Sequence, residues 1–367
     1  MKTKSAILYE YNQPLRVEEL DLGKPREKEV LVEMKSAGLC HSDLSIIKGV
    51  LRMPPLPCIP GHEGAGIVRE VGPGVTRVKP GDHVMMVWVP SCGQCYYCRK
   101  QQPYLCAEKD KTRVGTMLDG TYRLQKGTQN INMMMGVGTF SQFNTVSERS
   151  VLPINPQIPF ELAAVVGCSV MTGAGAVLNK AKVETGSSVA VVGTGGVGVS
   201  VLMGAVMANA TQIIAIDILD NKLEMAKQFG ATHTINAQKE DPVKKVLEIT
   251  GGIGVDYSFE VLGSLDTSLT TYRLIRRGGS AVILGVPDLE AKLPLPLFEI
   301  PLMEKSVLGS YYGSGNLLVD LPKFLDLYQI GRLPLGKMIT QRYRFQDINQ
   351  GFADMEAGKN IRGVVNF

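Results

Sequence analysis

The chain has 367 residues, of which 44% are hydrophobic and 20% charged, a composition typical of a folded globular protein and not of a disordered or fibrous one. This length exceeds what one hydrophobic core usually supports, so we expect two domains. The 39 basic and 35 acidic residues give a formal charge of +4 without long runs of one sign. Charge therefore gives no reason to expect nucleic acid or a membrane surface as a partner.

The start of the chain and its cysteines bear on where the protein works. Residues 1–14 lack the apolar stretch and cleavage site of a secretory signal, and we expect no run of about 18 apolar residues that would cross a membrane. Seven cysteines is an odd number, and four of them lie within fifteen residues, which favours metal-bound thiolates over disulfides. These features predict a cytoplasmic protein.

The first 170 residues or so are rich in short β-forming runs separated by Gly/Pro turns. The expected strands include Val30–Met34, Gly66–Val71 and His83–Val89, with turns at residues 72–74 and 80–81. This pattern predicts an antiparallel or barrel-like β domain.

Within this half, four cysteines follow the spacing C-x2-C-x2-C-x7-C: Cys92, Cys95, Cys98 and Cys106. Four thiolates on so short a segment fit one tetrahedral zinc, whereas four free thiols so close together would invite oxidation. The ligand set is complete and leaves no position for water, so this zinc is expected to be structural. A nucleic-acid zinc finger is the alternative, but a second ligand pair at finger spacing and a neighbouring basic-aromatic patch are lacking.

Other candidate metal ligands lie far apart along the chain. Cys40 is the first residue of the run C-H-S-D, and His62 and Glu63 lie in the glycine-rich run G-H-E-G-A-G at residues 61–66. Cys168 lies near residue 170, where the pattern of the sequence changes. Two thiolates and one imidazole leave a fourth position open to water or substrate, the arrangement of a catalytic zinc. Taken singly, such residues are more often a buried cysteine or a satisfied core histidine. Distance along the chain does not join them.

After about residue 170, apolar strands alternate with amphipathic segments of helical length, the pattern of a doubly wound parallel sheet. The expected strands are Ser188–Val192, Gln212–Ile216, Val255–Phe259, Ser280–Leu284 and Ser306–Ser310. The stretch from about Tyr311 contains an expected helix over Leu318–Ile330 and a final strand over Gly363–Phe367. We expect this last stretch to return to the first domain.

The first parallel strand runs into a G-x-G-x-x-G turn that opens a helix expected over Val199–Asn209. The residues of this loop are Gly193, Gly195, Gly196, Val197 and Gly198. Glycines allow a tight turn and a close approach of the backbone to a pyrophosphate, whose charge the helix N-terminus stabilises. The motif alone recurs in many folds, but a strand, a glycine turn and a helix in succession favour a dinucleotide site.

Asp217 follows the second strand, 24 residues after Gly193. An acid at this place accepts both hydroxyls of the adenosine ribose and repels a 2′-phosphate, which favours NAD over NADP. Lys222 lies five residues further on and is expected to brace the same ribose. In the alternative interpretation, Asp217 is the N-cap or a first-turn residue of a helix over Asn221–Phe229.

Three of these features occur in the order and spacing of a known family: the run at residues 61–66, the four-cysteine lobe and the glycine loop. The chain resembles the zinc-dependent medium-chain alcohol dehydrogenases, in the form that carries a structural zinc lobe, along nearly its whole length. The resemblance implies an α/β protein with a GroES-like β-barrel catalytic domain and a Rossmann domain. The implied boundaries are residues 1–169 for the catalytic domain, 91–107 for its zinc lobe, 170–310 for the NAD-binding domain and 311–367 for the C-terminal return.

The resemblance also implies roles for individual residues. At the catalytic zinc these are the ligands Cys40, His62 and Cys168, a carboxylate that approaches the metal (Glu63), the acid that orients the histidine (Asp43) and the hydroxyl that takes the substrate proton (Ser42). Around the cofactor they are nicotinamide contacts from Thr172 and Val197 and pyrophosphate contacts from His41 and Arg362. Trp88 matches a wall of the substrate pocket, although a lone buried tryptophan is more often plain core.

The chain also departs from the family pattern. Ser45 stands where many relatives have the last histidine of the proton relay, and His41 replaces an arginine common in animal members. In the similar glutathione-dependent formaldehyde dehydrogenases, acidic substrate-binding residues stand at the positions of Gly49 and Leu51, and an arginine stands at the position of Asp110. Their absence disfavours a thiol-adduct substrate.

The resemblance therefore implies an NAD-dependent alcohol dehydrogenase with one catalytic and one structural zinc per chain. It would act on small, mainly primary alcohols and their aldehydes or ketones, as a homodimer or homotetramer. Alternatives on the same scaffold are dehydrogenases for thiol-adduct, acyl-CoA or aromatic alcohol substrates. A zinc-stapled binding or structural protein without turnover is an alternative from another class, but the retention of Ser42, Asp43 and all three ligands argues against it.

Overall fold

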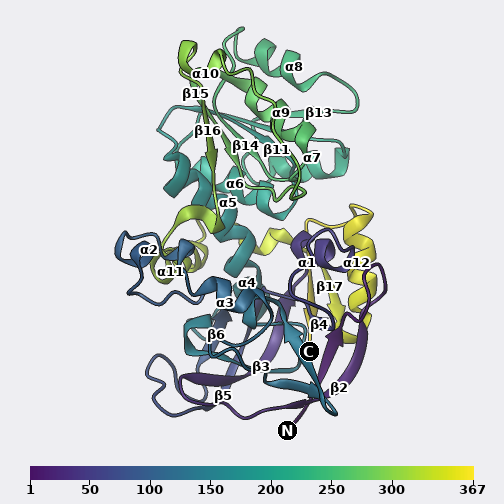
Figure 1. The fold of residues 1–367 in the computed structure, drawn as a ribbon. Helices are drawn as coiled ribbons and strands as arrows, with labels where there is room; N and C mark the ends of the chain where they lie inside the picture. Colours follow the sequence, from purple (N-terminus) through teal and green to yellow (C-terminus); the bar gives the residue numbers. More distant parts are fainter. The chain divides into compact units, whose positions relative to one another are not determined.

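The computed structural model describes all 367 residues, and its internal contacts divide the chain into two compact units. The first unit comprises Met1–Cys168 and Asn316–Phe367, and the second comprises Ser169–Gly315 (Figure 1). Each unit has sheets of its own. The boundaries expected from the sequence, at 169/170 and 310/311, concern functional domains and stay a prediction.

The first unit contains two sheets of mainly antiparallel strands. One sheet has the order β1-β2-β7-β8-β4, and the other has the order β10-β6-β5-β3-β18-β17 with β9 also paired to β3. Only β4 with β8 and β17 with β18 run parallel. The strands are β1 Lys2–Ile7, β2 Arg16–Leu22, β3 Glu29–Gly38, β4 Cys58–Ile59, β5 Gly64–Val71, β6 His83–Met86, β7 Leu124–Lys126, β8 Gln129–Met133, β9 Phe143–Ser147, β10 Val151–Pro153, β17 Ile339–Arg344 and β18 Arg362–Asn366.

The C-terminal segment completes the first unit. Strand β18 pairs antiparallel with β3, with Val364 opposite Gly38, so the last strand lies beside an N-terminal one (Figure 1). Phe352 packs edge-on against Phe140, with ring centroids 5.8 Å apart, in a core built from both segments. The α-helices of this unit are α1 His41–Ile47, α2 Tyr96–Arg99, α3 Lys109–Arg113, α4 Phe160–Val165, α11 Leu317–Gln329 and α12 Ile348–Glu356.

The second unit is built on six parallel strands in the order β13-β12-β11-β14-β15-β16. Numbered within the unit this is 3-2-1-4-5-6, the Rossmann order, in which ligands bind at the carboxyl ends of the strands. The strands are β11 Ser188–Val192, β12 Gln212–Asp217, β13 His233–Asn236, β14 Val255–Glu260, β15 Ile275–Ile283 and β16 Ser306–Gly309. The α-helices are α5 Met171–Gly175, α6 Gly196–Met207, α7 Asp220–Lys227, α8 Pro242–Ile249, α9 Leu265–Leu274 and α10 Glu299–Leu302.

Residues 160–181 form one continuous helical stretch, in which α4 and α5 alternate with wider π-helical turns at Val166–Val170 and Ala176–Ala181. Its length of 22 residues and mean hydropathy of 1.7 are sufficient, by composition alone, to cross a membrane. This stretch was not singled out from the sequence, because the polar residues Ser169, Thr172 and Asn179 interrupt its apolar run. Inside the protein, 83% of the most apolar window is buried, which accounts for its composition.

The fold class is confirmed, and the differences from the expected elements have local causes. Strand β15 begins at Ile275, five residues before the expected Ser280. The early start was not predicted, because residues 276–279 are polar or glycine and show no apolar pattern. Strand β13 was not expected, since Ile235 is its only apolar residue. Strand β6 ends at Met86, three residues before the expected Val89. The helices expected at Val199–Asn209 and Asn221–Phe229 begin earlier, as α6 and α7.

Candidate metal centres and cofactor loop

Asp43 connects the two segments that carry Cys40 and His62. It is the third residue of α1, and its Oδ2 accepts the N–H of Cys40, the N-cap residue, at 3.3 Å. Its Oδ1 accepts the N–H of Gly61 at 2.9 Å and lies 3.1 Å from Nδ1 of His62. A carboxylate cannot donate, so Nδ1 carries the proton and Nε2 presents its lone pair. The buried Asp43 thus sets the direction in which the imidazole binds.

The distant candidate ligands come together in the first unit. The side-chain ligand atoms of Cys40, His62, Glu63 and Cys168 lie within 4.8 Å of one another, and all four residues are buried. Sγ of Cys168 lies 3.3 Å from Nε2 of His62. A tetrahedral zinc with bonds of about 2.3 Å to sulfur and about 2.0 Å to nitrogen would place these two atoms about 3.5 Å apart. The donor set therefore fits zinc.

The backbone before His62 needs a glycine. Gly61 has φ of +96°, and a Cβ there would come within 2.5 Å of Thr139 Oγ1. Any other residue would strain the turn and displace a neighbour, because L side chains rarely adopt this conformation. The glycine-rich run at residues 61–66 is thus crowded at the position next to the ligand.

Glu63 forms a buried ion pair with Arg362, the first residue of β18. Oε1 of Glu63 and Nε of Arg362 are buried without hydrogen-bond partners. Burial raises the pKa of Glu63 to about 8 even though the Arg362 charge favours its ionised form. Arg362 is only 5% exposed, so the residue expected at the pyrophosphate lies against Glu63 in this structure.

The remaining predicted residues of the first unit lie around this site at different depths. Ser42 is half-buried, with its Oγ 3.8 Å from Sγ of Cys40. Trp88 is buried edge-on to the His62 ring, with centroids 6.0 Å apart. His41 is exposed at the start of α1, and Ser45 is half-buried one turn further along the helix.

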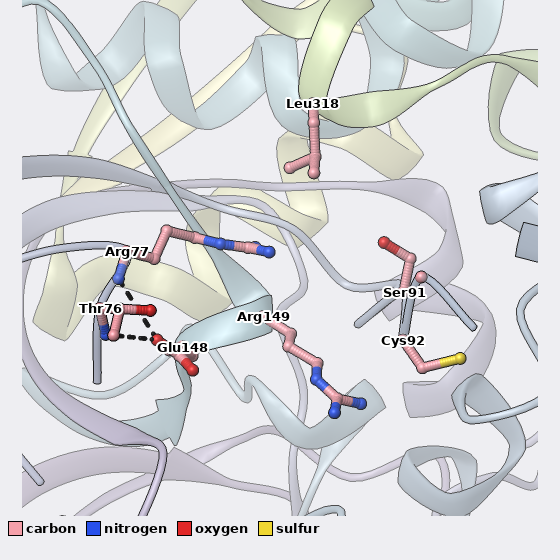
Figure 2. Close-up of a pocket in the computed structure, with 8 residues that line it drawn as sticks. Thr76, Arg77, Ser91, Cys92, Glu148, Arg149 and Leu318 are labelled. Atoms are coloured by element: carbon pink, nitrogen blue, oxygen red, sulfur yellow. Dashed lines mark hydrogen bonds between the residues drawn. The ribbon is translucent and has the colours of Figure 1, made fainter. Parts of the chain in front are cut away.

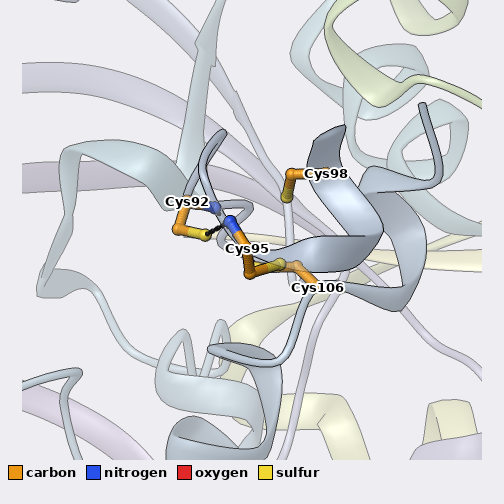
Figure 3. Close-up of side chains that lie close together, drawn as sticks. All are labelled: Cys92, Cys95, Cys98 and Cys106. Atoms are coloured by element: carbon orange, nitrogen blue, oxygen red, sulfur yellow. Dashed lines mark hydrogen bonds between the residues drawn. The ribbon is translucent and has the colours of Figure 1, made fainter. Parts of the chain in front are cut away.

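The four-cysteine lobe forms a second cluster (Figure 3). The sulfur atoms of Cys92, Cys95, Cys98 and Cys106 lie within 4.8 Å of one another, and none forms a disulfide. Sγ of Cys95 lies 3.9 Å from Sγ of Cys106, close to the edge of about 3.8 Å expected for tetrahedral zinc with four sulfur ligands. Backbone N–H donors lower the pKa of Cys95 to about 6, whereas burial raises that of Cys98 to about 12. Zinc fits here as well.

A hollow of about 210 Å³ lies beside this lobe and is lined by Arg77 and Arg149 on one side and by Ser91 and Cys92 on another (Figure 2). The backbone N–H groups of Thr76 and Arg77 donate to the Glu148 carboxylate on its wall. None of the predicted catalytic residues lines it. It is therefore separate from the site at Cys40.

The glycine loop of the second unit connects β11 to α6. Gly193 has φ of +98°, which a larger residue rarely adopts, and its N–H donates to the carbonyl of Ile216 at 2.8 Å. Gly195 is the N-cap of α6, and a Cβ there would meet nothing within 4 Å. Gly195 and Val197 are partly exposed. The open space over Gly195, at the N-terminus of a helix, fits a dinucleotide pyrophosphate.

Asp217, the last residue of β12, faces this loop. Its Oδ2 accepts both the N–H and the hydroxyl of Thr194, at 2.8 Å each. The N-cap interpretation of Asp217 is wrong, because α7 begins at Asp220 with Leu219 as its N-cap. Thr194 was not selected as a candidate residue from the sequence. The feature that could have indicated it is a hydroxyl side chain at a variable position of the G-x-G-x-x-G motif. Lys222 lies half-buried in α7, and Thr172 in α5.

Comparison with known proteins extends these observations to the whole chain. Residues 26–156 match the alcohol dehydrogenase GroES-like domain, and residues 196–329 match the zinc-binding dehydrogenase domain. Alcohol dehydrogenase B of Mycobacterium tuberculosis is 41% identical over 374 residues, covering 100% of this chain and 99% of that protein. The NDMA-dependent alcohol dehydrogenase of Amycolatopsis methanolica is 40% identical over 369 residues, with 100% and 99% coverage.

The chain belongs to the zinc-type medium-chain alcohol dehydrogenases. The S-(hydroxymethyl)glutathione dehydrogenase of a Synechocystis species is 39% identical over 370 residues, covering 100% of both chains. Among solved structures, benzyl alcohol dehydrogenase of Acinetobacter calcoaceticus has a TM-score of 0.94 at 32% identity, covering 100% of this chain and 99% of that one. The substrates named for members of this family thus differ.

Membership in this dehydrogenase family confirms the main functional predictions. The protein is an oxidoreductase with a four-cysteine zinc site, a zinc site at Cys40, His62 and Cys168, and an NAD-binding Rossmann fold. The interpretation as a binding or structural protein without turnover loses its support, since the full-length relatives named here are dehydrogenases.

Proposed function

We propose that this alcohol dehydrogenase oxidises mainly primary alcohols to aldehydes, reversibly and with NAD, at the site formed by Cys40, His62 and Cys168. The observation that carries the proposal is the orientation of His62. Its Nδ1 is held by Asp43 at 3.1 Å, and its Nε2 faces the sulfur of Cys168 at 3.3 Å. With three ligands and Ser42 beside them, a fourth coordination position is left for the substrate oxygen.

Each residue of the proposed site has a separate role in the reaction. Zinc, when bound, supplies a Lewis acid that lowers the pKa of an alcohol, and NAD, when bound, supplies the hydride acceptor. Ser42 takes the proton of the substrate hydroxyl and passes it toward solvent. Asp43 keeps the imidazole of His62 in the tautomer that binds metal. Trp88 forms an apolar wall and helps to exclude water from the site.

The residues predicted to bind NAD keep these roles in the proposal. The peptide groups of the loop Gly193–Gly198 and the N-terminus of α6 bind the pyrophosphate, assisted by His41 and Arg362. Asp217 accepts the hydroxyls of the adenosine ribose, and Lys222 braces the same ribose. Thr172 and Val197 contact the nicotinamide. For this role, the guanidinium of Arg362 must bind both the pyrophosphate and the Glu63 carboxylate. When the ion pair between Arg362 and Glu63 opens, Glu63 approaches the metal.

The names of relatives supply the alternatives for substrate and electron acceptor. Benzyl alcohol and S-(hydroxymethyl)glutathione stand for the aromatic and thiol-adduct classes. Gly49 and Leu51, in place of charged residues, favour uncharged alcohols over the glutathione adduct. The NDMA-dependent relative raises a second possibility, that turnover needs NDMA as acceptor and not free NAD.

A substrate scan tests the proposal. Purified zinc-loaded protein is assayed with aliphatic and aromatic primary alcohols, the glutathione adduct of formaldehyde, NAD, NADP and NDMA, while absorbance of the reduced cofactor or of NDMA is followed. We expect turnover of primary alcohols with NAD that exceeds turnover with NADP. Absence of turnover with every alcohol and acceptor would refute the proposal.

We also propose that the protein forms a homodimer or homotetramer through the edge of the Rossmann sheet. Strand β16 is the outer strand on one side, with Val307 37% exposed. The segment that precedes it carries exposed apolar side chains: Leu289, Leu297, Phe298 and Leu302. An apolar unpaired edge favours pairing with another strand. Light scattering should give two or four chains for the wild type and one for Val307→Glu; a wild-type monomer contradicts the proposal.

The predicted cytoplasmic location is kept as a part of this proposal. All seven cysteines are free thiols, and six of them belong to the two zinc clusters. Such thiolates are maintained in a reducing compartment. Fractionation of cells that express the tagged full-length chain would test this location.

A further inference from the structure

Thr194 occupies a defined place opposite Asp217. It lies between Gly193 and Gly195 and is fully buried. Strands β11 and β12 are parallel neighbours, with Val192 opposite Ile216, so their carboxyl ends meet at one edge of the sheet. The hydrogen bond from Gly193 to the Ile216 carbonyl continues this register, which brings Thr194 to the side chain of Asp217.

Four donors hold the Asp217 carboxylate. Oδ2 accepts the N–H and the hydroxyl of Thr194, and Oδ1 accepts the N–H groups of Ile218 at 2.8 Å and Leu219 at 3.1 Å. A carboxylate offers about four acceptor positions, so a ribose hydroxyl that binds Asp217 shares a position with one of these donors or displaces it. Three of the donors are backbone groups fixed by the fold. The Thr194 hydroxyl is therefore the one side-chain group that sets the orientation of this carboxylate.

We propose that Thr194 is a positioning residue that holds Asp217 for the adenosine ribose and thereby sets the affinity for NAD and the selectivity against NADP. The inference rests on the proposed cofactor role of Asp217. Without the hydroxyl, Oδ2 keeps a single N–H donor, and the carboxylate turns more freely about its broad terminal torsion. Affinity falls by the fraction of time spent in other orientations. A carboxylate that moves also repels a 2′-phosphate less strongly than one held in place.

Two substitutions separate this role from a general structural one. Thr194→Val keeps the shape of the side chain and removes the hydroxyl, whereas Thr194→Ser keeps the hydroxyl. Thr211→Val is the matched control, because the Thr211 hydroxyl donates to the Gly186 carbonyl at 2.8 Å in the same unit, at the opposite, amino ends of the strands. Thr194→Ala carries the same expectation as valine if valine does not fold.

The test measures binding separately from turnover. Zinc-loaded full-length protein is titrated with NADH and NADPH by fluorescence, and its melting temperature is recorded. We expect Thr194→Val to raise the Kd for NADH roughly fivefold, as for the loss of one hydrogen bond, and to narrow the ratio between the two cofactors. At saturating NAD, kcat should stay within about twofold while KM for NAD rises. Thr194→Ser and Thr211→Val should bind NADH as the wild type does.

Three outcomes overturn the proposal. These are an unchanged Kd for NADH in Thr194→Val, tighter binding in that variant, and a serine variant as weak as the valine one. In contrast, failure of the wild type to bind NADH would remove the proposed cofactor site itself. The two failures are distinguishable, because only the second affects the wild type.

Discussion

The two metal clusters of the first unit contain similar ligands but are built in different ways. The four sulfurs of Cys92, Cys95, Cys98 and Cys106 come from one short lobe, and two of these residues are partly exposed. Cys40, His62 and Cys168 come from three distant segments, and all are buried. Asp43 joins two of those segments by hydrogen bonds to Cys40, Gly61 and His62. The local cluster requires only its own loop, whereas the distant one requires the whole β domain.

This difference indicates which cluster does chemistry. A closed set of four thiolates stabilises a loop but leaves no position for a substrate. The three-ligand set leaves one position open, and Ser42, the proposed proton acceptor, lies 3.8 Å from a ligand sulfur. Loss of a ligand should therefore stop turnover at one cluster and loosen the structure at the other.

Removal of a ligand at the buried cluster should have the largest effect. We expect Cys40→Ala to lower kcat/KM by at least about a thousandfold, because the Lewis acid is lost or misplaced. The variant should keep its far-UV circular dichroism and one zinc per chain. Cys58→Ala is the control: Cys58 is also buried but belongs to neither cluster, so activity should remain. Near-normal turnover in Cys40→Ala would show that the site has been assigned to the wrong residues.

Removal of the proposed proton acceptor should have the next largest effect. Ser42→Ala should lower kcat by about 10²- to 10⁴-fold, the usual contribution of a positioned acid or base. Zinc content should stay at two per chain, as measured by elemental analysis. Ser45→Ala, one turn further along α1, should change kcat by less than about twofold. Equal losses in both variants would place Ser45 in the relay and contradict a path through Ser42 alone.

A smaller effect is expected when the orientation of His62 is disturbed. Asp43→Asn retains the size of the side chain but weakens its hold on Nδ1. We expect activity or zinc affinity to fall by about 10- to 100-fold, as is usual for partners of metal ligands. Asp82→Asn, at an exposed ion pair with Lys79, should have no such effect. If Asp43→Asn binds zinc and turns over like the wild type, the orienting role is wrong.

Disruption of the lobe should have the smallest effect on chemistry. Cys95→Ala should lose one zinc and lower the melting temperature by roughly 5–10 °C, because metal binding contributes to folding. Its kcat at a temperature where it remains folded should stay within about twofold. Differential scanning calorimetry and initial rates check the two parts. A folded but inactive Cys95→Ala would assign the lobe a part in catalysis.

Local sequence patterns predicted the parts of this molecule that depend on local structure. The strand Ser188–Val192 is observed as expected, because a buried parallel strand shows as an unbroken apolar run. The four-cysteine cluster follows from spacing alone. In contrast, residues 276–279 show no strand pattern, although β15 begins before them, and the register between β14 and β15 shifts across this stretch. The fold class, the family, zinc and NAD are confirmed, whereas the roles of individual site residues stay predictions.

Contacts between distant segments were beyond reach of the sequence. Cys40, His62 and Cys168 were joined only through the resemblance to a family. The ion pair between Glu63 and Arg362 links residues 299 positions apart, and no local pattern indicates it. The hold of Thr194 on Asp217 depends on the register of two strands, which no spacing rule provides. Such contacts depend on tertiary packing, and packing is visible only in the fold.

The most direct test measures zinc content and activity in the wild type, Cys40→Ala and Cys95→Ala. Elemental analysis and initial rates with a primary alcohol and NAD should give two zinc ions and full activity for the wild type. Cys40→Ala should retain one zinc without activity, and Cys95→Ala one zinc with activity. Two zinc ions in Cys40→Ala, or loss of activity in a folded Cys95→Ala, would contradict the division of the two clusters into a chemical and a structural site.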